Sequence, residues 1–152
     1  MSSTDLEQLE DWVGPLLARL EPKQRRQLAR RVATTLRQNQ RERIKAQENP
    51  DGSAYAPRKP QNRQKAGSIR RRGMFNKLRT AKYLRTRGTS DAAVAGFFGR
   101  VNRIVRVHQY GLHDNVDGDG PRVKYAERQL LGFSDADREA IQDALLEHLT
   151  TP

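Results

Sequence analysis

A run of 39 residues without an acidic side chain is the feature that most constrains how this chain can fold. Residues 52–90 contain twelve Lys and Arg, no Asp or Glu, and few large apolar side chains. Blocks of like charge repel one another and bury little surface, so such a segment is expected to be extended or to order against a partner. Residues 23–45 hold nine Lys and Arg and one acid. This distribution is the electrostatic footprint expected of a surface that faces phosphate or an acidic protein.

The N-terminal region has apolar residues at helical spacing. Gly14-Pro15 predicts a kink or a break in the first helix, and Pro22 suits the first turn of a second helix. The turn sequence at residues 49–52 ends that helix. The second helix has one narrow apolar stripe and a broad basic face. The stripe consists of Leu28, Val32, Leu36 and Ile44.

The C-terminal half predicts a short helix, two strands and a final helix. The short helix covers 74–84, and the strand-like runs are 92–98 and 103–110, separated by a connection of hairpin length. Ser134 with Asp137 three residues later forms a capping-box signal for the last helix. The predicted fold class is α+β: N-terminal helices, a small antiparallel sheet with an extended basic arm, and a C-terminal helix packing on the sheet.

We expect a single domain over residues 1–152. Within it, 1–48 form the helical N-terminal region, 49–90 the basic arm, and 91–152 the hairpin with the C-terminal helix. A hairpin of two strands is marginal by itself in water. It would need a third strand from elsewhere in the chain, the helices or a neighbouring subunit, and this weakness is a hint of oligomerisation.

The sequence lacks the residue patterns of common catalytic and metal sites. Cysteine is absent, which excludes disulfides and thiolate zinc sites. The segment 115–120 resembles a calcium loop, but Ala126 stands where the bidentate glutamate is needed. His108 and His113 are five residues apart, which suits neither one helix face nor one strand face. We therefore expect no enzymatic activity, no metal and no cofactor.

The net charge of +11 indicates an anionic or acidic partner. No apolar run is long enough to span a bilayer, so no membrane contact is expected. Non-specific binding of nucleic acid through phosphate contacts is one function that this charge supports. The basic residues expected to make partner contacts are Arg70, Arg71, Arg72, Lys77, Arg79, Lys82, Arg85 and Arg87.

Several segments, colinear over most of the chain, resemble the phage virion morphogenesis family, the tail-completion proteins of P2-like contractile-tailed phages. The His-Gln-aromatic-Gly element at 108–111 and the Leu-Gly-aromatic-Ser element at 131–134 are the most specific of these. The other matching segments are 43–52, 67–71, 74–79 and the remainder of 128–137.

This resemblance implies a structural virion protein made in the host cytoplasm and placed at the head-proximal end of the tail. There it would complete the tail and join it to the head as a homo-oligomeric ring, sixfold by analogy with other tail and neck rings. Its neighbours would be tail tube or terminator proteins and head-neck proteins, with non-specific contact to genomic DNA as a further expectation. His108 and Tyr110, in one of the matching segments, are added to the expected assembly contacts.

Overall fold

The computed structural model describes residues 3–58, 73–115 and 120–150. It contains four helices and two separate two-stranded antiparallel sheets within those ranges, which confirms the α+β class. The elements in chain order are α1 (Ser3–Leu17), α2 (Pro22–Lys45), β1 (Leu84–Gly88), β2 (Ala93–Phe97), α3 (Asn102–Tyr110), β3 (His113–Asn115), β4 (Arg122–Lys124) and α4 (Asp135–Thr150).

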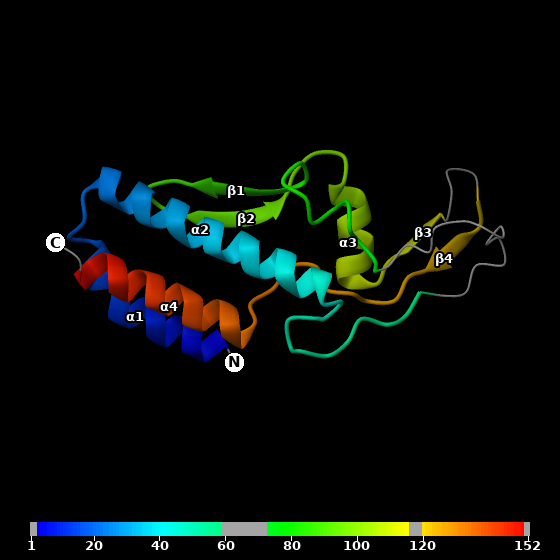
Figure 1. Ribbon diagram of the computed structural model, residues 1–152, viewed down its shortest axis with the longest axis horizontal. Coiled ribbons are helices and arrows are strands. Elements are labelled where there is room, and N and C mark those ends of the chain that lie inside the picture. The colour runs from blue at the N-terminus through cyan, green and yellow to red at the C-terminus, as the bar shows by residue number, and fades with distance from the viewer. Residues whose placement is uncertain (1–2, 59–72, 116–119, 151–152) are drawn as a thin grey trace.

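Helix α2 is the central element of the elongated molecule. The β1–β2 hairpin lies along one side of it and α4 along another, with α1 beside α4 (Figure 1). Pro22 occupies its first turn, as predicted, and the Glu21 amide donates to the Gln24 side chain at 3.1 Å. The predicted apolar stripe of α2 is buried. The first helix continues through Pro15 to Leu17, so the predicted break after Gly14 is not found.

The β1–β2 hairpin packs on α2 through small side chains. In its register Gly88 pairs with Ala93 and Thr86 with Ala95, and both alanines pack on the core formed by Leu28 and its neighbours in α2. A Cβ atom built on Gly88 would lie 2.7 Å from the backbone nitrogen of Arg30, so only glycine permits this approach. The alternate residues of β1, including both arginines, point away from α2 and are exposed.

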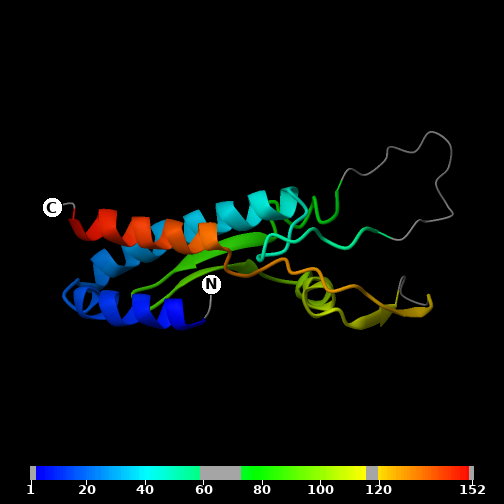
Figure 2. The ribbon, with the colours of Figure 1, turned by 90° about the horizontal axis from the view of Figure 1, so that it is seen from below.

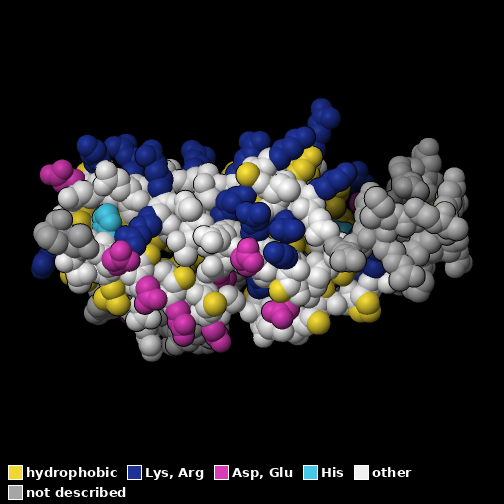
Figure 3. Space-filling model, viewed as in Figure 1, with side chains coloured by type: hydrophobic (Ala, Val, Ile, Leu, Met, Phe, Trp, Pro, Cys, Tyr) yellow, Lys and Arg dark blue, Asp and Glu magenta, His cyan; other side chains and the backbone are white. Residues whose placement is uncertain are grey.

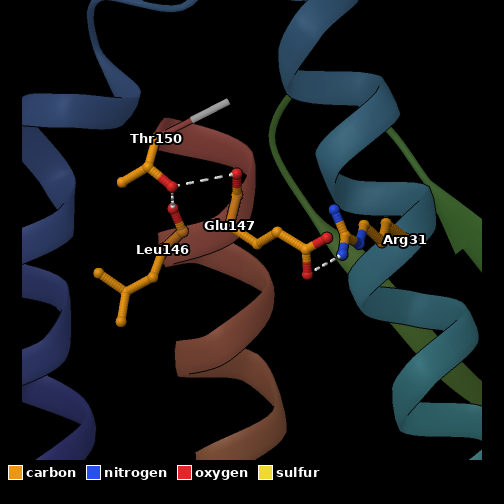
Figure 4. A network of polar contacts seen from close by, with 4 residues as sticks. All are labelled: Arg31, Leu146, Glu147 and Thr150. Carbon is orange, nitrogen blue, oxygen red and sulfur yellow. Dashed lines mark hydrogen bonds and ion pairs between the residues drawn. The ribbon is translucent and has the colours of Figure 1, made fainter. Parts of the chain in front are cut away.

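Helix α4 begins with the predicted capping box. The Ser134 amide donates to Asp137 Oδ2 at 2.9 Å, and the Asp137 amide donates to Ser134 Oγ at 3.1 Å. Ala144 and Leu145 then pack against the apolar stripe of α2. The last turns of α4 add an ion pair of 2.5 Å between Glu147 and Arg31 of α2 (Figure 4). Both partners are largely exposed, so this pair contributes little to stability compared with the apolar contact.

A second core joins α2 to the opposite end of the molecule, where α3 and the β3–β4 ribbon lie (Figure 2). Its buried members are Ile44, Leu84, Phe97, Val101, Val105 and Leu130. The residues that the structure describes therefore form two apolar clusters along the long axis, both of which include residues of α2.

Three sequence predictions for the middle of the chain are wrong. Residues 103–110 form helix α3, not a strand, and β2 pairs instead with 84–88, a segment assigned to the basic arm. The β-branched residues of α3 suggested a strand, but Val101 and Val105 are four apart and bury the same helix face in the second core. Gly111, with φ 63°, ends the helix in the left-handed conformation. The predicted helix at 74–84 is a series of turns leading into β1.

An irregular segment, residues 129–132, is held by side chains from several elements, which we call the polar clamp. Arg43 donates to the carbonyl oxygens of 129 and 130 at 2.9 and 2.8 Å. Gln109 accepts from the amides of 130 and 131 and donates to the carbonyl of 131. Asn49 accepts from the amide of 129, and Gln40 from that of 132. This segment has no strand or helix partner. The side chains therefore bind its backbone amides and carbonyls, which would otherwise be shielded from water without a hydrogen bond.

Next to the clamp, four aromatic rings form a continuous row of edge-to-face contacts. Ring centroids are 5.8 Å apart for Tyr55–Phe75, 4.8 Å for Phe75–His108 and 5.1 Å for His108–Tyr125, all edge to face. Burial, together with the positive charges of Arg128 and Arg58, lowers the pKa of His108 to about 4. The imidazole is therefore neutral at physiological pH and acts as a packing side chain.

The clamp predicts a large stability loss for Gln109→Ala. This substitution removes three hydrogen bonds to the backbone of 130 and 131. We expect the free energy of unfolding to fall by about 2–3 kcal/mol, measured by urea denaturation. Gln38→Ala, at an exposed position of α2, is the matched control and should stay within about 0.5 kcal/mol of the parent. Equal losses in the two variants would contradict the role of the clamp.

His108 predicts a pH dependence of stability. Its pKa is about 4 in the folded chain and near 6.5 when unfolded, so the unfolded chain binds the proton more readily. The stability that neutral His108 provides is complete above about pH 6.5 and is lost as the pH falls toward 4. As the pH is lowered over this range, the melting temperature of His108→Phe should fall less than that of the parent. His113→Asn, at an exposed strand position, is the control, and an unchanged slope in His108→Phe would refute the assignment.

Candidate assembly surfaces

The residues predicted to contact partners fall in different environments. Positions 70–72 lie outside the described residues. Lys77 and Lys82 are exposed on the turns that lead into β1, whereas Arg79 is half-buried. Lys82 Nζ lies 5.3 Å from the centre of the Tyr83 ring, a cation–π contact that steadies this part of the surface.

Arg85 and Arg87 lie on the outward face of β1 and belong to a larger basic surface. Helix α2 contributes exposed arginines at helical spacing on the side next to β1 (Figure 3). Arg37 Nε donates to the Leu84 carbonyl at 2.7 Å and so fixes the helix beside the strand. We call this surface the basic edge. Its members are Arg26, Arg30, Arg41, Arg85 and Arg87. The sequence showed the basic face of α2, but the site prediction left it out because β1 was not recognised as its neighbour.

Acidic side chains gather on the opposite long side of the molecule, over α1 and α4, in the lower half of Figure 3. In α4 they recur every four residues, which aligns them along one side of the helix. We call this surface the acidic face. Its members are Glu7, Glu10 and Asp11 of α1 and Asp135, Glu139, Asp143 and Glu147 of α4. The sequence analysis did not single it out, although the four-residue spacing of the acids was a usable signal.

The two predicted contact residues of α3, His108 and Tyr110, differ in exposure. His108 is packed between Phe75 and Tyr125, where a partner cannot reach most of its ring. Tyr110 is 64% exposed, and Ile104 on the same helix is 50% exposed. Tyr110 and Ile104 are therefore the large hydrophobic side chains of α3 that are exposed to another molecule.

The described part of the chain has neither a metal-binding cluster nor a membrane-spanning helix. It contains no group of three or more His, Asp or Glu placed to hold a metal ion. Residues 116–119 of the Asp- and Gly-rich loop lie outside the described ranges. A shallow, mainly apolar cleft of about 180 Å³ lies between α1, α2, α4 and the hairpin turn. Within the described ranges, no helix has both the length and the apolar character needed to cross a membrane.

Nearly the whole chain is similar to known phage proteins. The chain matches the model of the phage virion morphogenesis family over residues 4–150. It is 39% identical over 147 residues to the tail completion protein S of Escherichia phage P2, and the match covers 95% of this chain and 97% of that protein. No solved structure matches significantly. The family resemblance carried by the sequence motifs is thereby confirmed: this chain belongs to the phage virion morphogenesis family.

Proposed function

We propose that this protein completes the head-proximal end of a contractile phage tail and joins the tail to the head. The observation that carries the proposal is the match to a tail completion protein over nearly the full length of both chains. Family membership supports a structural role in phage tail morphogenesis. The head-proximal position, the joining step and residence in the virion after synthesis in the host cytoplasm are parts of the proposal.

The physical character of the chain supports a structural role. A ring subunit needs separate surfaces for its two neighbours and for the layers above and below. The described residues present a basic edge, an acidic face and, at α3, exposed Ile104 and Tyr110. Both sheets have only two strands, which leaves strand edges open for pairing with other chains. We propose a homo-oligomeric ring, sixfold by analogy with other tail and neck rings.

The basic arm is proposed to dock on adjacent tail tube or terminator proteins and on head-neck proteins. Among its described exposed residues, Lys77 and Lys82 stand on the turns beside Phe75 and Leu78, which pack against the second core. Charged residues at the rim of an interface steer association and set its register. Arg79 is half-buried and contributes less directly.

A second candidate function is non-specific binding of nucleic acid. The observation that favours it is the alignment of five arginines along α2 and β1, which suits a phosphate backbone. This alternative requires tight, salt-sensitive binding of duplex DNA by the isolated chain. The joining function requires none.

Interrupting the gene in the source phage tests the proposed function. Electron microscopy of the lysate should show filled heads beside separate tails that are abnormal in length or at their upper ends. Empty heads would favour a role in DNA handling and with it the nucleic-acid alternative. Normal, joined particles would contradict both functions.

The arm predicts a specific assembly defect. Substituting the three arginines at 70–72 by Glu should block head–tail joining, because their charge is proposed to bind neighbouring virion proteins. Phage yield in a complementation assay should fall at least about 100-fold, a loss that several charge reversals in one interface can produce. Arg100→Glu with Arg122→Glu and Lys124→Glu, on the loop before α3 and on β4, is the control with the same change in charge and should keep the parent yield. Normal yield from the 70–72 variant would contradict the docking role of the arm.

A further inference from the structure

The basic edge and the acidic face lie on opposite long sides of the same elongated molecule. Helix α2 and strand β1 run along one side, and α1 and α4 run roughly parallel to them along the other (Figure 1). In the space-filling view, Lys and Arg line the border over α2 and β1, and most acidic side chains lie toward the other border (Figure 3). The subunit is thus charged oppositely on two sides that could face successive copies.

The basic edge is a firmly positioned surface. Arg26, Arg30 and Arg41 stand on one helix, and β1 is fixed beside that helix by the close approach of Gly88 and by the bond from Arg37 to the Leu84 carbonyl. The ion pairs between described residues use Arg31, Arg103 and Arg138. None of the arginines of the basic edge takes part in them, so their charges remain available to a partner.

The acidic face is available in the same way. Its two end members in α4, Asp135 and Glu147, have partners inside the chain. Glu139 and Asp143 between them are exposed, as are Glu10 and Asp11 on α1, and no ion pair between described residues includes these four. The face therefore presents a band of acids of roughly the same extent along the molecule as the arginines opposite.

We propose that neighbouring copies of this chain bind head to tail, with the basic edge of one copy on the acidic face of the next. This inference rests on the proposed function and names the contact that builds its ring. A contact between two different surfaces is heterologous and can close into a ring, whereas a contact of either surface with itself would oppose like charges. Binding of DNA would use only the basic edge and would leave the acidic face without a partner.

Charge reversal of the full-length chain tests the interface. The basic-edge variant carries Arg26→Glu, Arg41→Glu and Arg87→Glu, and the acidic-face variant carries Glu10→Lys, Glu139→Lys and Asp143→Lys. Native mass spectrometry at low salt should show oligomers of the parent chain. Each variant should need at least about 100-fold higher concentration to assemble, because like charges then face each other. Circular dichroism verifies that both variants fold.

Two rescue experiments make the test specific. The chain with all six substitutions has its charges exchanged at the substituted positions, where unlike charges again face each other, and it should assemble at a clearly lower concentration than either three-residue variant. An equimolar mixture of the two three-residue variants should assemble into alternating oligomers. The control variant, with Arg100→Glu, Arg122→Glu and Lys124→Glu, changes the charge equally at the far end of the molecule and should assemble as the parent does.

The interface and the proposed function can fail separately. A parent chain that stays monomeric at low salt, single-surface variants that assemble normally, or a six-residue variant that stays monomeric would each overturn the interface. A monomeric parent that binds duplex DNA with steep salt dependence would overturn it in favour of the nucleic-acid alternative. Loss of oligomers in the two variants with full phage yield would support the interface and contradict the ring function.

Discussion

The arrangement of this protein depends on the polar clamp around residues 129–132. An irregular, largely buried backbone segment needs partners for its amides and carbonyls, and here Gln40 and Arg43 of α2 and Gln109 of α3 provide most of them. Gln40 also donates to Asp137 at 3.0 Å, which links the clamp to the cap of α4. Three helices are thereby held in one orientation, and Leu130 is carried into the second core.

The clamp gives a structural reason for the sequence elements that identify the family. Gln109 belongs to the His-Gln-aromatic-Gly element, and Asn49 belongs to the turn that follows α2. The segment they bind is the start of the Leu-Gly-aromatic-Ser element. These elements therefore specify how the helices and the irregular segment fit together. The charged surfaces that can meet other molecules lie elsewhere, on α2, β1, α1 and α4.

The sequence predicted those parts of the fold that local signals determine. The helix beginning at Pro22, its apolar stripe and the Ser134–Asp137 capping box follow from spacing and capping rules. The hairpin was misplaced because the strand signals of β1 are weak. The strand is short and its outward residues are arginines. Its inward Gly88 is needed for the close approach to α2 and gives no strand signal. Residues 103–110 looked like a strand because several of them are β-branched, although the four-residue spacing of Val101 and Val105 and the Gly111 that ends the segment are helix signals. The candidate surfaces combine distant segments, so spacing alone could not assemble them.

We propose that this charged, elongated subunit closes the head-proximal end of a tail through contacts between copies. The most direct measurement is a cryo-electron microscopy map of the head–tail junction in the source phage. We expect a ring of this chain at the head-proximal end of the tail, with α2 and β1 of each copy against α1 and α4 of the next. Absence of the chain from that position, or a ring whose copies meet through other elements, would contradict it.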